Sequence, residues 1–267
     1  MYLLKLIGII TLWIVILLLW NSNAYAQGKY QTETIYSTEL NVEKTIWIYL
    51  PKTYYTNPQK KYPVVYMHDG QNLFDESLAT YGCWNIMQTA NALNLECIII
   101  GIAHGNEKRI LELTPYKHEK YGGGNGDLYL NFIVNSVKPF IEMKFRTLTD
   151  KRNTVLMGSS LGGLISLYGG LKYQDIFGKV GVFSPSLWYS EEIYNLAEKT
   201  QIKNQKYYLM CGDKESEHMV SQMQRMTQIL SQNSNDKNIF AKVVENGEHN
   251  ERLWEREFGE AIQWLLK

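Results

Sequence analysis

The sequence Thr154-Val155-Leu156-Met157-Gly158-Ser159-Ser160-Leu161-Gly162-Gly163 places a glycine-flanked serine at the end of a short apolar run. The apolar run predicts a buried strand, and the small and apolar residues at 161–171 predict a helix. A serine between such a strand and helix lies in a tight turn, which is why glycines flank it. The turn lifts the hydroxyl above the sheet, with the helix N-terminus beneath it to stabilise negative charge. We therefore predict that Ser160 is a nucleophile and that Ser159 is only its neighbour.

Strands and helices alternate along the chain from residue 62 onward. Strands are predicted at 62–67, 97–102, 154–157, 179–183, 206–211 and 240–244. Helices are predicted at 84–95, 127–145, 161–171, 191–199, 216–232 and 251–266. This alternation requires parallel pairing through helical crossovers, and residues 31–38 and 43–50 predict an N-terminal antiparallel hairpin. With the serine turn, the prediction is an α/β-hydrolase fold with a mostly parallel central sheet and helices on both faces.

The first 26 residues have a composition different from the rest. Lys5 precedes an almost wholly apolar run at 6–20, and residues 21–26 end in Ala24-Tyr25-Ala26. This arrangement is typical of a secretory signal peptide, and an uncleaved membrane anchor is the alternative. We predict cleavage before Gln27, one domain over 27–267, export to the periplasm or the medium, and no stable membrane insertion after leader removal.

Composition excludes several classes of protein. The chain has 27 Lys and Arg against 27 Asp and Glu, so nothing indicates nucleic-acid binding. Its apolar content of 45% is that of a globular protein. The odd cysteine count, at Cys83, Cys97 and Cys211, gives no disulfide framework and no zinc pattern, although one bridge is possible in an oxidising compartment.

A serine nucleophile needs a base and an orienting acid, which in this fold follow it in the order serine, acid, histidine. Only His218 and His249 follow Ser160. His249 lies between the last strand and the last helix, where the fold delivers its base, whereas His218 is predicted to be a solvated or pocket-rim residue. Asp213 and Glu215 both follow the strand at 206–211, and the residues alone do not separate these two candidate acids.

A tetrahedral oxyanion needs two preorganised N–H donors. The backbone amide of Leu161 is one candidate, and that of Gln71, in the loop after the strand at 62–67, is the other. The neighbouring His68 and Asp69 are weak evidence for a metal, because no third ligand lies nearby in the sequence. The polar, glycine-bearing residues 103–126 predict a flexible active-site loop.

Several further stretches resemble the putative-esterase branch of the α/β-hydrolases, which includes siderophore, feruloyl and acetyl-xylan esterases, S-formylglutathione hydrolase and mycolyltransferases. The matching residues are 65–75, Trp84, 101–109, Glu112-Leu113-Thr114-Pro115, 132–139, Phe145-Arg146-Thr147, 158–163, Ser184-Pro185-Ser186-Leu187-Trp188, Gly247-Glu248-His249-Asn250 and Trp254. The resemblance covers about residues 30–267. In relatives the acid often lies three residues after the glycine that ends the strand, so the resemblance favours Glu215, with Asp213 second.

The resemblance also implies a substrate site. Gln71 matches the position whose amide completes the oxyanion hole, and Asn72, Trp84 and Trp188 are expected in the substrate pocket. The predicted activity is hydrolysis of a carboxylic ester through an acyl-enzyme on Ser160, with no cofactor or metal. A siderophore-type or saccharide-linked small-molecule ester is the expected substrate. An acyltransferase with the same triad and a catalytically silent binding protein are the alternatives.

Overall fold

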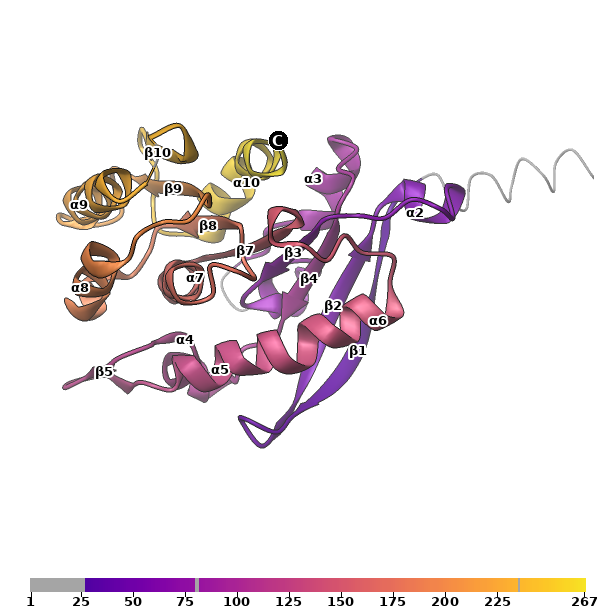
Figure 1. The fold of residues 1–267 in the computed structure, drawn as a ribbon, viewed down its shortest axis with the longest axis horizontal. Coiled ribbons are helices and arrows are strands. Elements are labelled where there is room, and N and C mark those ends of the chain that lie inside the picture. Colours follow the sequence, from indigo (N-terminus) through magenta and orange to yellow (C-terminus); the bar gives the residue numbers. More distant parts are fainter. Residues whose placement is uncertain (1–26, 80–81, 235) are drawn as a thin grey trace, which may run out of the picture.

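The computed structural model describes residues 27–79, 82–234 and 236–267. An eight-stranded sheet runs through the molecule in the order β1-β2-β4-β3-β7-β8-β9-β10 (Figure 1). Its strands are β1 (Lys29–Ser37), β2 (Val42–Leu50), β3 (Val64–Met67), β4 (Ile98–Ile102), β7 (Thr154–Ser159), β8 (Lys179–Phe183), β9 (Lys206–Gly212) and β10 (Ile239–Val244). The strands from β4 to β10 pair in parallel, whereas β1 pairs antiparallel with β2, and β2 antiparallel with β4. The predicted fold class and N-terminal hairpin are confirmed.

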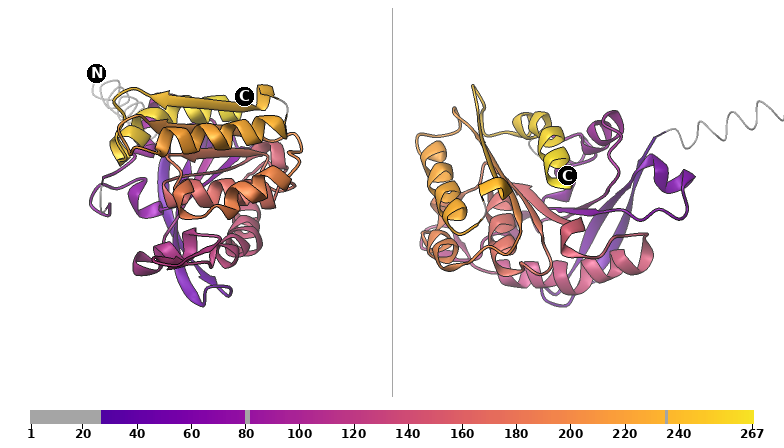
Figure 2. Two further views of the ribbon diagram at one scale, coloured as in Figure 1. Left: turned by 90° about the vertical axis from the view of Figure 1, so that its left-hand side faces the viewer. Right: turned by 45° about the horizontal axis from the view of Figure 1, so that its top comes forward.

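Helices cover both faces of this sheet, as the two turned views show (Figure 2). The principal helices are α3 (Ile86–Ala92), α5 (Gly126–Phe132), α6 (Lys138–Lys144), α7 (Leu161–Lys172), α8 (Glu192–Lys199), α9 (Met219–Gln232) and α10 (Glu251–Leu266). Shorter helices are α2 (Lys52–Thr56) and α4 (Arg109–Leu113). A π-helical segment, Ile133–Val137, joins α5 to α6, and Pro139 lies in the first turn of α6, where its missing N–H is tolerated.

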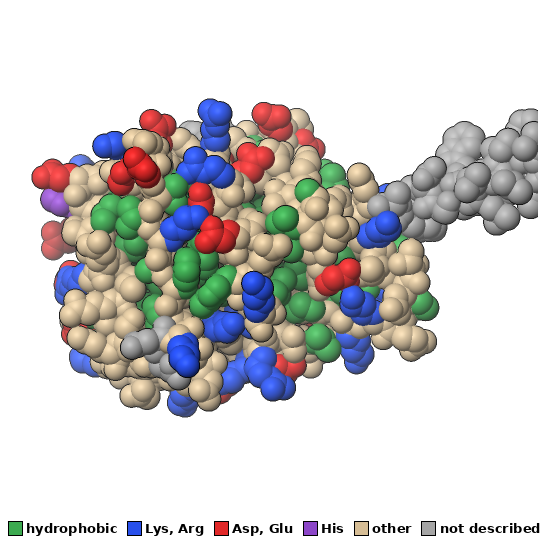
Figure 3. All heavy atoms as spheres, turned by 90° about the horizontal axis from the view of Figure 1, so that it is seen from above, with side chains coloured by type: hydrophobic (Ala, Val, Ile, Leu, Met, Phe, Trp, Pro, Cys, Tyr) green, Lys and Arg blue, Asp and Glu red, His purple; other side chains and the backbone are tan. Residues whose placement is uncertain are grey.

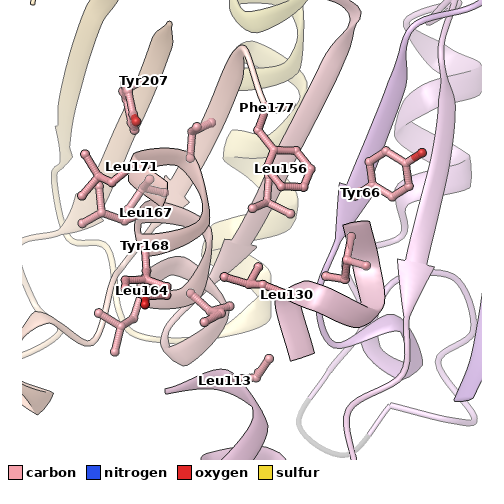
Figure 4. Close-up of a cluster of buried hydrophobic side chains, with 14 of the residues drawn as sticks. Tyr66, Leu113, Leu130, Leu156, Leu164, Leu167, Tyr168, Leu171, Phe177 and Tyr207 are labelled. Carbon is pink, nitrogen blue, oxygen red and sulfur yellow. The ribbon is translucent and has the colours of Figure 1, made fainter. Parts of the chain in front are cut away.

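Two hydrophobic cores lie on opposite faces of the sheet because successive side chains of a strand point in opposite directions. On β3, Tyr66 faces the core formed with α5 to α9, whereas Val65 and Met67 face the core formed with α3 and α10. On β7, Leu156 belongs to the first core, where it packs near Leu130 and Phe177 and the aliphatic side chains of α7 (Figure 4). The sheet is thus buried on both sides, which explains its nearly continuous apolar strands.

The segment predicted as one long flexible loop, residues 103–126, contains regular structure instead. It includes the 3-10 turn η2 (Asn106–Lys108), α4, and a small hairpin of β5 (Lys117–His118) and β6 (Gly122–Gly123). The hairpin depends on Gly122, Gly123 and Gly124, which all have positive φ values and therefore conformations that side chains disfavour.

The predicted signal peptide, residues 1–26, lies outside the residues that the structure describes. Within the described ranges no helix has the length and apolarity to cross a membrane. All three cysteines are buried with free thiols, so the disulfide left open by the sequence is not formed. Acidic and basic side chains both occur, with hydrophobic groups between them, on the face that includes α10 and α3 (Figure 3).

Candidate active site

Ser160 lies at the turn between β7 and α7 in a conformation that side chains rarely adopt, with φ 57° and ψ −120°. Such backbone strain is concentrated at functional sites. The turn also requires glycine for space, because a Cβ on Gly158 would lie 2.9 Å from the carbonyl oxygen of Gly162. A Cβ on Gly163 would lie 2.6 Å from the carbonyl oxygen of Phe183. The glycines therefore permit the close packing that presents the Ser160 hydroxyl at the carboxyl edge of the sheet.

The imidazole of His249 connects Ser160 to a carboxylate. Its Nε2 lies 3.0 Å from Ser160 Oγ, and its Nδ1 lies 2.7 Å from Glu215 Oε2. The ring meets Trp254 edge to face, with ring centres 5.1 Å apart. The side chain of Asn250 caps α10 by accepting a hydrogen bond from the Leu253 amide, which fixes the loop just after the histidine. The imidazole is thereby held on two sides.

The carboxylate of Glu215 is completely buried and well supplied with donors. Its Oε1 accepts hydrogen bonds from the Ser184 hydroxyl at 2.7 Å and from the Gly212 amide at 2.5 Å. The indole N–H of Trp254 donates to the Ser184 oxygen at 2.8 Å, so the serine proton is directed at Glu215. Asp213, the other candidate acid, is exposed to solvent. The structure therefore brings Glu215, and not Asp213, to His249.

The two candidate oxyanion donors lie in the first turns of two helical segments. Leu161 is the first residue of α7, and Gln71 is the middle residue of the 3-10 turn η1 (Gly70–Asn72). Among the residues that the structure describes, neither backbone N–H has an acceptor. Unpaired N–H groups at a helix start favour an anion. Gln71 itself does not line the cavity described below, but its neighbours Asp69 and Asn72 do.

Contacts from a distant segment hold the turn that contains Gln71. Its side-chain amide donates to the His104 carbonyl at 3.0 Å and accepts from the His104 amide at 3.1 Å. Asp69, in the left-handed conformation, accepts two hydrogen bonds of 2.8 Å from the Arg109 guanidinium. Burial opposes ionisation of Asp69, but the charge and hydrogen bonds of Arg109 hold the pKa of its carboxyl below the usual value. This Asp69–Arg109 pair clamps the turn to the segment that follows β4.

His68 neighbours Asp69 in the chain but does not act as a base near neutral pH. Its Nδ1 lies 2.9 Å from the Tyr129 hydroxyl, and its ring packs against the tight turn at Gly158. Burial lowers the pKa of His68 to about 4, so the ring is neutral at pH 7. Since Asp69 is paired with Arg109, the weak sequence evidence for a metal at these two residues gains no support from their contacts.

A cavity of about 790 Å³ opens beside Ser160 and His249. Asn72 and Trp84 line it, as the resemblance implied for the substrate pocket. Trp84 is also buried and stacks on Phe183, so it is a core residue as well as a wall. Trp188 lies outside this cavity: its side chain is 50% exposed and borders a separate cleft of about 320 Å³. The structure thus places Trp188 against His118 and Tyr121 at this separate cleft, and not in the cavity beside Ser160 as the resemblance implied.

Sequence reasoning missed several residues of the site. Ser184 supports Glu215, and Ser186 Oγ lies 3.3 Å from Ser160 Oγ. Both serines belong to the Ser184-Pro185-Ser186 stretch directly after β8, which the family match included without a role for either residue. Arg109 and Glu251 line the cavity. Two signals could have indicated this: Arg109 ends the family-matching stretch 101–109, and both residues follow predicted strands at the carboxyl edge of the sheet.

Comparisons with known proteins agree with this architecture. The model of the putative esterase family matches residues 37–265. The chain is 29% identical to the uncharacterized protein YbbA of Bacillus subtilis over 239 residues, 82% of this chain and 90% of that protein. It is also 29% identical over 135 residues to a siderophore triacetylfusarinine C esterase of Aspergillus fumigatus, 48% of this chain and 45% of that protein.

A solved structure with the same fold is that of the CE1 ferulic acid esterase AmCE1/Fae1A from Anaeromyces mucronatus. The two superpose with a TM-score of 0.68 at 22% sequence identity, over 90% of this chain and 93% of that one. The family model extends from the last residue of β1 to the last turn of α10, so it includes the other seven strands of the sheet, the serine turn and the histidine loop. The chain belongs to the putative esterase family and is a carboxylic ester hydrolase.

Proposed function

We propose that this protein is a serine esterase with Ser160 as nucleophile, His249 as general base and Glu215 as orienting acid. The observation that carries the proposal is the unbroken chain of contacts from Glu215 through His249 to Ser160, at 2.7 and 3.0 Å. Three such groups in hydrogen-bond reach match the requirements of an activated serine. The strained backbone of Ser160 and the burial of Glu215 support the same roles.

The proposed reaction proceeds in two steps. Ser160 Oγ attacks the ester carbonyl carbon while His249 Nε2 takes the hydroxyl proton, and the imidazolium formed is stabilised by Glu215. The resulting oxyanion accepts hydrogen bonds from the amides of Leu161 and Gln71. The C–O bond to the alcohol then breaks as His249 returns the proton to the leaving oxygen. Water, activated by the same imidazole, next attacks the acyl-enzyme and releases the acid.

Hydrolysis is favoured over acyl transfer because the site is open to solvent. The side chain of His249 is 34% exposed, so water reaches the base that must activate it. For the substrate we propose a siderophore-type or saccharide-linked ester, since relatives named above are a siderophore esterase and a ferulic acid esterase. We further propose that residues 27–267 act as one catalytic domain, exported to the periplasm or the medium by the leader at 1–26.

A fluorophosphonate probe tests the proposed chemistry directly. The wild-type protein is expected to become covalently labelled, with the label on the peptide that contains Ser160, because only an activated serine attacks the probe at neutral pH. Intact-mass spectrometry and peptide mapping measure both results. An unlabelled native protein, or a label on another residue, would contradict the proposal.

A second prediction concerns the effect of the Asp69–Arg109 pair on kcat. Arg109→Gln leaves the Asp69 carboxylate buried without its partner, a situation that costs about 3–5 kcal/mol when the pair is fully buried and less here, because Arg109 is 29% exposed. The 3-10 turn η1 would then relax and displace the backbone amide of Gln71, the proposed oxyanion donor. We expect kcat to fall by roughly 10–100-fold with a smaller change in KM, as for small misplacements of positioning groups.

Steady-state kinetics with p-nitrophenyl acetate measures this effect, with thermal unfolding recorded in parallel. Arg152→Gln is the matched control, because Arg152 pairs with Asp150 at an 85% exposed site distant in sequence from the turn. An Arg109→Gln variant with unchanged kcat would show that the pair does not position the turn.

A further inference from the structure

The turn after β8, residues 184–186, is bonded through its backbone to the two elements that carry the ends of the proposed triad. The Ser184 amide donates to the carbonyl of Met210 in β9 at 2.7 Å, and the Ser186 amide donates to the Ser160 carbonyl at 3.0 Å. The turn is therefore fixed in position relative to both the nucleophile and the strand that leads to the acid.

Ser186 ends this turn with its side chain beside the nucleophile. The residue is 3% exposed, and its Oγ lies 3.3 Å from Ser160 Oγ. Within the described part of the chain, this contact is the one hydrogen bond of the Ser186 hydroxyl. It is longer than the usual O–H···O distance of about 2.7–2.8 Å, as hydrogen bonds of catalytic groups often are before substrate binds. Ser186 is not among the described residues that line the cavity beside Ser160, so it acts on the reaction through Ser160.

The direction of each hydrogen bond in the triad follows from counting protons. The carboxylate of Glu215 only accepts, so the proton between it and His249 belongs to Nδ1, and a ring that acts as a base presents a lone pair at Nε2. Ser160 therefore donates its single proton to Nε2, at 3.0 Å. With that proton committed, Ser160 Oγ can only accept from Ser186, so Ser186 is the donor of their contact.

We propose that Ser186 is a positioning residue, whose hydroxyl donates to Ser160 Oγ and keeps the Ser160 proton directed at His249. A hydroxyl oxygen accepts two hydrogen bonds, so one lone pair of Ser160 stays free to attack the ester carbonyl. As the Ser160 proton passes to His249, the same donor stabilises the negative charge that develops on Oγ, and Ser186 keeps its own proton throughout. The inference rests on the proposed function and adds a residue to its machinery.

The turn after β8 thus supplies a hydroxyl to each end of the triad. Ser184 donates to the Glu215 carboxylate at 2.7 Å, and Ser186 donates to Ser160. Pro185 separates these two serines, and its ring fixes the backbone φ angle between them. A turn of three residues therefore sets the nucleophile and the acid relative to one another.

Two substitutions separate the hydroxyl of Ser186 from the space that the side chain fills. Ser186→Ala is expected to lower the rate constant of fluorophosphonate labelling, and kcat/KM for p-nitrophenyl acetate, by about 5–30-fold, as for loss of one hydrogen bond to a reacting group. Ser186→Thr keeps the donor and is expected to stay within about threefold of the wild type in both. Both quantities report formation of the covalent bond to Ser160, and neither depends on hydrolysis of the acyl-enzyme.

Labelling carried to completion distinguishes a slower nucleophile from misfolded protein. Every chain of each variant is expected to become labelled in the end, whereas a merely structural role of Ser186 would leave part of the Ser186→Ala chains unlabelled. Ser166→Ala is the matched control, because it removes a buried hydroxyl of α7 that donates to the Gly162 carbonyl at 2.7 Å. It is expected to keep the wild-type rates.

Three results would exclude the proposed role of Ser186 and leave the esterase proposal intact. These are labelling of Ser186→Ala at the wild-type rate, incomplete labelling of Ser186→Ala, and a Ser186→Thr variant that is labelled completely but as slowly as Ser186→Ala. If the wild type takes no label at all, the esterase proposal itself fails, and this inference fails with it.

Discussion

Replacing Ser160 with alanine is expected to lower kcat for ester hydrolysis by about 10⁵–10⁶-fold, the loss seen when the nucleophile of a serine triad is removed. The variant keeps the turn and the oxyanion donors, but His249 has no hydroxyl to deprotonate and no acyl-enzyme forms. Binding of substrate is retained, so KM for any residual activity should change far less than kcat. Hydrolysis of p-nitrophenyl acetate, with fluorophosphonate labelling of the same samples, measures the effect.

Ser159→Ala is the matched control, because it removes a hydroxyl from the neighbouring position at the end of β7. Ser159 is 6% exposed, and within the described part of the chain the hydrogen bond of His249 Nε2 goes to Ser160 and not to Ser159. We expect its kcat to stay within about tenfold of the wild-type value. Substantial turnover by Ser160→Ala, or a loss confined to Ser159→Ala, would remove Ser160 from the proposed role. Circular dichroism of both variants distinguishes a chemical loss from unfolding.

The strands of the sheet could be predicted from the sequence because both faces of the sheet are buried. The apolar runs of β3, β7 and β9 could only be parallel strands covered by helices, and the structure pairs them in that way. The serine turn could also be predicted from the sequence, because local contacts, such as that between Gly158 and Gly162, require its glycines. Local requirements of this kind leave a pattern within a few residues.

The remaining features of the site depend on contacts between segments far apart in the chain. The Asp69–Arg109 pair links positions 40 residues apart, so the sequence suggested only a flexible loop where the structure has a clamped one. The family resemblance implied that Trp188 lines the substrate pocket, whereas in the structure Trp188 borders a separate cleft. The choice between Asp213 and Glu215 likewise depended on a contact with Ser184, which directly follows another strand, β8.

Replacing Glu215, the proposed acid of the triad, is expected to have the second large effect on kcat. Glu215→Gln is expected to lower kcat by about 10³–10⁴-fold, as for loss of the charged orienting group in a serine triad. Ser184 and the Gly212 amide both donate to the Oε1 position, so the amide oxygen of glutamine should occupy it. The amide NH₂ would then face His249 and donate to Nδ1. That arrangement leaves the proton on Nε2, and the imidazole cannot accept the proton of Ser160.

Asp213→Asn removes a carboxylate that lies two residues away but is exposed, so it is the matched control. Solvent screens its charge, and kcat is expected to stay within about tenfold of the wild-type value. Steady-state kinetics of the two variants with one ester separates the candidates, because their predicted effects differ by at least about two orders of magnitude. A large loss in Asp213→Asn with near-normal turnover in Glu215→Gln would assign the role to Asp213. It would also require the loop after β9 to rearrange during catalysis, because Ser184, Gly212 and His249 all direct their hydrogen bonds to Glu215.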